Sequence, residues 1–540
     1  MDIAVALRYG LFPRAMKLRL LVTLLFVLAG SLTGRAEEAL TILHTSEHHG
    51  TLQPIENGPF KGLGGVARRA ALVERIRRGA KHVLLVDSGD LLVGTAMSSV
   101  FHGAPDIAAM NLMGYDALAL GNHDFDFGIE HLAALRKQAR FPFLCTNLRP
   151  KKTGVCQAFV IKALGRLRIG LLGLIGHRSY PDLFSRSALR EMEFQDPIAA
   201  AKAAARGLRQ RVDLVVAVTH QETEEDLALA KGVPEINVIV GGHTPGFDGL
   251  IPATGQTPVQ GRIDPLPAGP ILVKSHQQAR TLGRLDLVYD KGLRAAEARN
   301  LPVDSTLPEQ PKVAALVQNY ARRLDAAANH VLGQALVDLE GDAPQVRTRE
   351  TNFGSLLADL ARSRVGTEIA LLNSGLIRGS IPSGPVTLKR VMHALPYEES
   401  LISFKLTGAQ LQQAMENSVS ELPRTSGRFL QVSGLSYIFD PSAPAGSRVK
   451  GIWIQGVPLE RNRDYSVVVE QFLAEGGDGY AVFLQGRDRV EHQSPLRDLL
   501  SSALETAPVT AREDGRIRSV VPIPPSVPDS FRGGVEGERK

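Results

Sequence analysis

Short apolar runs in the first half of the chain are each followed by a polar side chain within three residues. These runs cover residues 39–44, 82–86, 117–120, 214–218 and 238–240. Runs of this length that are rich in Val, Leu and Ile are typical of buried strands. Residues 67–78 have helical spacing, with basic residues on the outward side. Buried strands alternating with helices predict a layered α/β fold for this half.

The pattern changes after residue 300. Residues 301–332 contain prolines and then apolar positions at helical spacing, which predicts a connecting segment that ends in a helix. An extra helix of the first domain is the alternative. Further on, a helix is expected to begin near residue 349 and a strand at 369–372, so the second half mixes helices and strands. A chain of 540 residues is too long for one core, and about two to four domains are expected.

The two ends of the chain differ from the rest. Basic residues precede the apolar run 20–28, and small residues follow it up to Ala36. This is the layout of a secretory signal, which we assign to residues 1–36, with Met16 as an alternative start. An uncleaved anchor helix is the alternative, but the run is short for a span of about 20 residues. Residues 521–540 are rich in Pro, Gly and charge and are expected to be a disordered tail.

These features predict an exported protein, periplasmic or extracellular, without a stable membrane anchor. No apolar stretch that resembles a lipid-anchor signal ends the chain. Cys145 and Cys156 are the only cysteines. In an oxidising compartment a disulfide between them is possible, and two separate buried thiols are the alternative.

Net charge gives little support for binding a nucleic-acid polymer. The formal net charge is +6, but residues 1–36 hold five basic residues against one acidic residue. Removing this +4 leaves +2 for the exported chain. The basic balance is therefore largely a property of the signal.

The polar residues that follow the five runs have the chemistry of metal ligands. They are Glu47, His49, Asp90, Asn122, His220 and His243. In layered α/β proteins the carboxyl ends of strands converge on one crevice. This number of oxygen and nitrogen donors exceeds the need of one ion, and Asp90 is suited to bridge two ions about 3.5–4 Å apart. Taken singly, each residue could be a turn former or a satisfied core histidine.

A second group of side chains lies after residue 345. Arg349, Arg378 and Arg428 offer planar forks suited to phosphate or carboxylate. Tyr397 and Phe472 offer flat faces for a base, and Asp478 can accept hydrogen bonds from sugar hydroxyls. On their own these residues also fit a purely structural role, because arginines often pair with acidic residues on the surface and aromatic residues mostly fill cores.

Five motifs carry a family resemblance: Glu47-His48-His49-Gly50, Gly89-Asp90, Gly121-Asn122-His123-Asp124, Thr219-His220 and Gly242-His243. They resemble the motifs of calcineurin-like metallophosphoesterases, and their order and spacing are most similar to the exported 5'-nucleotidase and UDP-sugar hydrolase family. The second group resembles that family's C-terminal domain. The resemblance implies an α/β fold with an N-terminal layered β-sandwich domain flanked by helices at 37–300, a linker with a helix at 301–332 that would carry the hinge of a domain rotation, and an α+β substrate-binding domain at 333–520.

The same resemblance implies a role for each matching residue. Glu47, His49 and Asp90 would hold one divalent ion, and Asp90, Asn122, His220 and His243 the other. His123, paired with Asp126, would stabilise the transition state, whereas Asp124 is expected to be a bystander. The implied substrate-binding residues are Arg349, Asn352, Asn373, Arg378, Tyr397, Arg428, Phe472 and Asp478.

The implied activity is metal-dependent hydrolysis of nucleoside 5'-monophosphates, with UDP-sugars as further candidate substrates, by attack of activated water on phosphorus. The substrate would be a small nucleotide, the two ions Zn, Mn, Co or Mg, and the oligomeric state is open. The alternatives are a hydrolase for 2',3'-cyclic nucleotides or a sulfur ester, and a non-catalytic nucleotide-binding protein with a decayed metal site.

Two departures from the family pattern affect the first metal site. Glu47 stands where Asp is usual, and Pro245 where His or Gln is usual. Proline offers no side-chain ligand, so weak or exchangeable binding is expected at that site. Glu398 and Glu399 also differ from the usual Gly or Asn beside the base pocket.

Overall fold

The computed structural model describes residues 37–523, apart from 56–59, 182, 185, 279, 398–399 and 493–494. The predicted signal, Glu398, Glu399 and residues 524–540 of the predicted tail lie outside these residues. Within the described ranges no helix is both long and apolar enough to cross a membrane.

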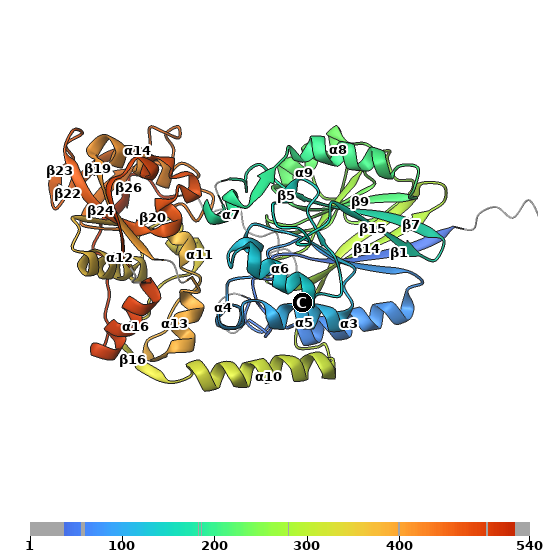
Figure 1. The fold of residues 1–540 in the computed structure, drawn as a ribbon, viewed down its shortest axis with the longest axis horizontal. Coiled ribbons are helices and arrows are strands. Elements are labelled where there is room, and N and C mark those ends of the chain that lie inside the picture. Colours follow the sequence, from blue (N-terminus) through green and yellow to red (C-terminus); the bar gives the residue numbers. More distant parts are fainter. Residues whose placement is uncertain are drawn as a thin grey trace, which may run out of the picture.

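Two sheets form the first half of the chain (Figure 1). The seven-stranded sheet has the order β12-β15-β14-β1-β2-β3-β4. Its strands are β1 (Glu38–Thr45), β2 (Val83–Asp87), β3 (Ala117–Ala119), β4 (Phe143–Leu144), β12 (Gly261–Ile263), β14 (Thr281–Tyr289) and β15 (Leu293–Pro302). The six-stranded sheet has the order β11-β13-β10-β9-β7-β6. Its strands are β6 (Phe159–Leu164), β7 (Leu167–Ile175), β9 (Leu214–His220), β10 (Val238–Gly241), β11 (Phe247–Pro252) and β13 (Ile271–Lys274).

Alternating side chains explain how each sheet is covered on both faces. Leu84 and Val86 of β2 pack with Val216 and Val218 of β9 in a buried cluster between the sheets. Leu85, which points the other way, belongs to the cluster under the helices. The helices on that face are α3 (Val66–Gly79), α4 (Ala96–Phe101), α5 (Ala104–Met113) and α6 (Ile129–Gln138), and those over the second sheet are α8 (Pro197–Leu208) and α9 (Thr223–Gly232). The predicted layered α/β sandwich is confirmed.

Parallel pairing brings the strand ends to one edge. Thr45 at the end of β1 lies opposite Asp87 at the end of β2. In the other sheet, Thr219 of β9 lies opposite Gly241 of β10. The Ser88 hydroxyl donates to the Val240 carbonyl at 2.9 Å and so joins the two sheets at this edge.

The helix α10 (Pro311–Ala328) follows the first half and leads to the second (Figure 1). Its apolar side, with Val313, Val317 and Leu324, packs into the cluster beneath α3 and α5. The helix that was predicted in the connector is therefore present, and it packs against the first half.

The second half mixes helices and strands. Its main sheet has the order β20-β17-β24-β19-β25, and a smaller sheet has the order β23-β22-β21-β26. The strands are β16 (Val331–Ala335), β17 (Ile369–Asn373), β18 (Gly384–Thr387), β19 (Leu401–Thr407), β20 (Leu430–Ser433), β21 (Leu435–Phe439), β22 (Val449–Ile454), β23 (Val457–Pro458), β24 (Asp464–Glu470), β25 (Arg487–His492) and β26 (Ile517–Ser519). The helices are α11 (Ala343–Val346), α12 (Asn352–Val365), α13 (Leu388–Ala394), α14 (Gly408–Ser418), α15 (Gln471–Ala474) and α16 (Leu496–Thr506). Apolar clusters lie on both faces of the main sheet, as expected for an α+β unit.

Cys145 and Cys156 form a disulfide, with their Cα atoms 5.8 Å apart. It closes a loop after β4 that runs past β5 (Leu148–Pro150), a strand paired with β8 (Met192–Phe194). Of the two alternatives, the bridge is confirmed.

Candidate active site

The predicted metal ligands converge at the common edge of the two sheets. Donor atoms of Asp90, His220 and His243 lie within 4.8 Å of one another, and so do those of Glu47, His49 and Asp90. Asp90 is common to both groups, as expected of a bridging ligand. The sixth predicted ligand, Asn122, joins them through its Oδ1, which is 3.1 Å from Nε2 of His220.

Unusual backbone conformations aim these side chains. Glu47, His49, Asp90 and His243 have φ values of 51°, 49°, 55° and 67°. A positive φ is costly for residues other than glycine and is often found at functional sites. Gly121 is required for a different reason, since a Cβ there would lie 2.2 Å from Asp90 Oδ1 and 2.8 Å from His220 Cε1. The loops are therefore shaped to crowd these donors together.

Charges within the cluster are strongly coupled. Burial favours the neutral form of His220, but Asp90 and Glu47 outweigh it and raise the pKa of His220 to about 10. Burial, followed by the charge of His220, lowers the pKa of His243 to about 3. Burial raises the pKa of Asp90, yet His220 and His123 bring it well below its usual value.

The donor set fits divalent cations. Two carboxylates, one amide and three imidazoles form a mixed oxygen and nitrogen set that suits several first-row ions. Glu47 and Asp90 repel each other in a buried site, and cations would relieve this repulsion. Pro245 is exposed, so the structure offers no side-chain donor at that position. The first group therefore has Glu47, His49 and Asp90 as its predicted protein ligands.

His123 lies beside the cluster and is held from two sides. Its Nδ1 is 2.7 Å from Asp126 Oδ2, and its backbone N–H donates to Asp90 Oδ1 at 2.9 Å. Burial lowers the pKa of His123, but Asp126 and Asp90 more than compensate and raise it. Because Nδ1 is turned to Asp126, Nε2 is left to face the site.

Asp124 belongs to neither donor group, and its side chain holds the loops of the site together. Its buried carboxylate accepts hydrogen bonds from the backbone N–H groups of Gly121, Asp90 and Leu91 at 2.8, 3.2 and 2.9 Å. It thus fixes the loop of Asp90 to the loop of Asn122 and His123. When a carboxylate lies in a motif that is rich in metal ligands, the sequence does not show whether it binds backbone N–H groups or an ion.

Two predicted substrate residues from the second half reach this cluster. Arg378 Nη2 lies 3.4 Å from Nε2 of His123 and also donates to the hydroxyl of Tyr397. The Tyr397 ring centroid is 6.4 Å from that of His123. Nearby, the Ser99 hydroxyl of α4 donates to the Pro396 carbonyl at 3.0 Å. The second half therefore meets the metal-ligand cluster directly.

Arg349 lies on the surface, whereas Arg347 lies near the predicted substrate residues of the second half. The Arg349 side chain binds Gln345 and Glu513 at 2.9 and 2.5 Å on the surface. Arg347 is affected by the charges of Arg378, Asp478 and Tyr397, and burial together with Arg378 lowers its pKa to about 10. Its Nε is buried without a hydrogen-bond partner among the described residues. Two arginines lie one residue apart here, and the sequence does not show which of them points inward.

Asn352 also lies away from the site. Its Oδ1 accepts from the Glu340 backbone N–H at 2.8 Å, and its Nδ2 donates to the Asp338 carbonyl at 2.7 Å. The amide is therefore used to join the start of α12 to the preceding segment. These two hydrogen bonds give Asn352 a structural role that requires no bound substrate.

The remaining predicted substrate residues gather around Asp478. Asn373 Nδ2 donates to Asp478 Oδ2 at 2.7 Å. Burial raises the pKa of Asp478, while Asn373, Arg428 and Arg347 partly offset the effect. Phe472 packs against Gly477, where a Cβ would lie 2.5 Å from its ring. Arg428 also pairs with Glu421 at 3.2 Å.

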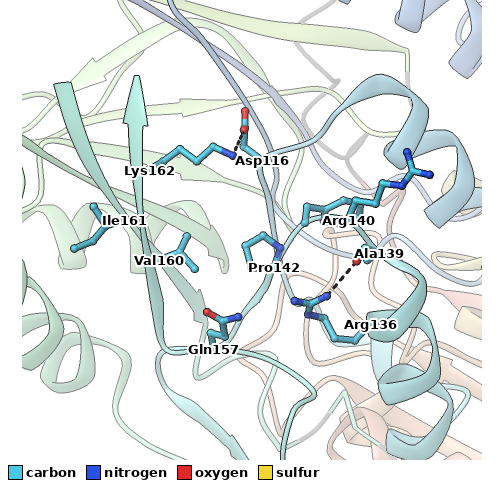
Figure 2. A pocket seen from close by; sticks show the side chains of 10 residues that line it. Asp116, Arg136, Ala139, Arg140, Pro142, Gln157, Val160, Ile161 and Lys162 are labelled. Carbon is cyan, nitrogen blue, oxygen red and sulfur yellow. Dashed lines mark hydrogen bonds and ion pairs between the residues drawn. The ribbon is translucent and has the colours of Figure 1, made fainter. Parts of the chain in front are cut away.

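A hollow of about 340 Å³ lies elsewhere, between α6 and β6, and it contains none of the predicted site residues (Figure 2). Lys162 pairs with Asp116 at 2.7 Å, and Arg136 donates to the Ala139 carbonyl at 3.2 Å. Lys162 and Asp116 thus neutralise each other in the wall of the hollow, and Arg136 binds a backbone carbonyl.

The layered sandwich with a carboxylate, imidazole and amide cluster at its strand ends defines a hydrolase of the metallophosphoesterase class. Residues 40–247 match the calcineurin-like phosphoesterase family, and residues 331–485 match the 5'-nucleotidase C-terminal domain. The 5'-nucleotidase of Bos taurus is 30% identical over 504 residues, which cover 85% of this chain and 87% of the relative. The snake venom 5'-nucleotidase of Gloydius brevicauda is 31% identical, over 85% and 84% of the two chains.

A solved structure supports the same relationship. The 5'-nucleotidase precursor of Thermus thermophilus has a TM-score of 0.78 and 34% identity, and the match covers 89% of this chain and 99% of that one. The chain belongs to the 5'-nucleotidase family, whose members are phosphoester hydrolases. A calcineurin-like phosphoesterase domain implies divalent metal ions, in agreement with the donor set described above.

Proposed function

We propose that this chain is an exported hydrolase that uses two divalent cations to release phosphate from nucleoside 5'-monophosphates. The observation that carries the proposal is the meeting of Arg378 with His123. A guanidinium of the second half, suited to binding phosphate, lies against the metal-ligand cluster of the first. A substrate gripped by one half would then have its phosphoryl group beside the donors of the other.

The metal roles follow from the two groups of donors. Glu47, His49 and Asp90 would hold one ion, and Asp90, Asn122, His220 and His243 the other. Bound cations would polarise the phosphoryl oxygens and lower the pKa of a bound water toward neutrality. Zn, Mn, Co and Mg all accept such donors.

The chain's own residues supply positioning and charge. His123, oriented by Asp126, faces the site through Nε2 and would stabilise charge that develops on the phosphoryl group. Arg378 and Arg347 would bind the phosphate, and their buried N–H groups are suited to an anion. Asp478 would accept from the ribose hydroxyls, and Tyr397 and Phe472 would stack on the base.

A panel of substrates against metals tests this function. Purified protein, stripped of metal, would be assayed with added manganese, zinc, cobalt or magnesium. The substrates would be a nucleoside 5'-monophosphate, a UDP-sugar, a 2',3'-cyclic nucleotide and a thiosulfate ester. We expect metal-dependent phosphate release, fastest from the 5'-monophosphate. Preference for another substrate, or tight nucleotide binding without turnover under every metal, would contradict the proposal.

Export is supported by the signal pattern at residues 1–36 and by the Cys145–Cys156 disulfide, which is typical of oxidising compartments. Expression of the full chain with a C-terminal tag, followed by fractionation, tests this part. The exported fraction should contain a chain that begins near residue 37, as read by N-terminal sequencing.

A further inference from the structure

A buried ion pair lies directly behind the two histidines of the second donor group. Lys274, the last residue of β13, and Asp226 of α9 have fully buried side chains, with Nζ 3.0 Å from Oδ2. Neither residue belongs to the predicted ligand set. Burying an ammonium and a carboxylate is costly, so the pair calls for an explanation beyond attraction.

The contacts of Lys274 show what the pair holds. Its Nζ donates to the Gln221 carbonyl at 2.9 Å, to the Gly242 carbonyl at 2.9 Å and to the Thr244 hydroxyl at 2.8 Å. Gln221 directly follows His220. Gly242 and Thr244 directly flank His243 on either side. Apart from Asp226, these acceptors of the ammonium are therefore all chain neighbours of a predicted metal ligand.

Asp226 completes the arrangement from the other side. Its Oδ1 accepts from the Thr219 hydroxyl at 2.7 Å and from the Gln221 side-chain amide at 2.9 Å. Thr219 and Gln221 flank His220. Together the Lys274 and Asp226 side chains form hydrogen bonds with the residues on either side of His220 and of His243.

The surrounding fold makes room for the pair. A Cβ at Gly241 would lie 2.5 Å from Lys274 Cε and 2.6 Å from Asp226 Oδ2. At the site, the imidazole rings of His220 and His243 lie close together, and the distance from His243 Nδ1 to His220 Nε2 is 3.1 Å. His243 also has a positive φ, a conformation that needs support from its surroundings.

We propose that Lys274 and Asp226 are positioning residues that set the metal affinity of the His220–His243 site by fixing the two histidine loops relative to each other. This inference rests on the proposed function, because it takes the two histidines to be metal ligands. The pair acts by geometry, through its hydrogen bonds to the residues on either side of both histidines. Groups that orient metal ligands commonly change affinity by about 10–100-fold when they are removed.

The test separates positioning from simple stabilisation. Lys274→Met removes the three hydrogen bonds but leaves Asp226 buried and unpaired, which costs stability. The double variant Lys274→Met/Asp226→Asn removes both charges and therefore leaves no unpaired charge in the core. It still lacks the hydrogen bonds from Nζ to the two histidine loops. Lys162→Met, which breaks the partly exposed Lys162–Asp116 pair outside the metal-ligand cluster, is the control for loss of a lysine–aspartate pair.

Cobalt(II) titration of metal-free full-length protein, followed by visible absorption and calorimetry, gives affinity without turnover, and thermal unfolding of the same samples gives stability. We expect cobalt to bind the double variant at least tenfold more weakly than the wild type, while Lys162→Met binds it as the wild type does. A loss smaller than tenfold in the double variant would overturn the inference. Wild-type protein that binds no cobalt would instead refute the metal site itself, and with it the proposed function.

Discussion

Arg378 Nη2 lies 3.4 Å from Nε2 of His123, although the two residues are 255 positions apart and come from different halves of the chain. The other ring nitrogen of His123 is held by Asp126 at 2.7 Å. The imidazole is thus fixed between a carboxylate and a guanidinium. A phosphoryl group bound at Arg378 would lie next to Nε2, where a histidine can stabilise its charge.

This geometry predicts that His123→Ala reduces turnover strongly and leaves metal content nearly unchanged. Loss of a group that stabilises charge in the transition state commonly costs about 10²–10³-fold in kcat. Steady-state kinetics on a nucleoside monophosphate and elemental analysis of the same preparation would check it. His220→Ala is the comparison, since it should lose metal as well as activity. If His123→Ala lost both metals, His123 would be a ligand.

Arg347 and Arg349 form a natural matched pair, because only Arg347 faces Arg378 and Asp478. Arg347→Met should raise KM for nucleotide by about tenfold or more, since a charge-assisted hydrogen bond contributes about 1.5–3 kcal/mol. Arg349→Met should leave KM within about twofold, because its partner is the exposed Glu513, and surface ion pairs contribute little. The reverse order of effects would restore Arg349 as the substrate residue.

The contrast between these arginines shows how far sequence patterns reach. The strand ends at Asp90, His220 and His243 could be predicted because parallel pairing brings such ends to one edge. The inward turn of Arg347 could not, since it depends on how the segment after α11 leaves the helix. The bonds of Asp124 to backbone N–H groups could not be predicted for a related reason, because backbone donors are not visible in side-chain identity.

Contacts between the two halves of the chain could not be predicted from the sequence either. Arg424 of the second half donates to both carboxylate oxygens of Glu222 at 3.0 Å. Glu222 lies two residues after His220. Neither residue stands in a sequence pattern that identifies its partner, since charged residues are common along the chain. The family resemblance implies two domains but carries no information on the contacts between them.

Phe472→Ala should raise KM for a nucleoside monophosphate far more than for p-nitrophenyl phosphate. The ring packs on Gly477, next to Asp478, where a base would stack. Loss of one base–aromatic contact costs about 1–3 kcal/mol, and p-nitrophenyl phosphate has no nucleobase and no ribose. Kinetics on both substrates with one preparation would check this. Equal effects on both would contradict the stacking role.

The disulfide between Cys145 and Cys156 should stabilise the first half of the chain. It spans 11 positions, and closing a loop of that size contributes about 3 kcal/mol in the chain-entropy model. Cys145→Ala/Cys156→Ala should therefore unfold at a lower temperature, as measured by scanning fluorimetry. A reductant provides the control, because it should lower the midpoint of the wild type and leave that of the variant unchanged. An identical midpoint for oxidised wild type and variant would contradict the stabilising role.

The first metal site gives the last prediction. Pro245 is exposed and has no donor, so Glu47, His49 and Asp90 are left as the predicted protein ligands for that ion. The wild type should then retain one ion tightly and exchange the other during dialysis. Pro245→Gln returns an amide oxygen to this position and should tighten the weak site on the order of tenfold, or about 1.4 kcal/mol. Pro245→Leu is the control, because it frees the backbone in the same way but adds no donor. Titration with manganese, followed by elemental analysis, separates the two ions. Two ions held equally tightly by the wild type would mean that another group, from solvent or from the chain, already fills the place that proline leaves.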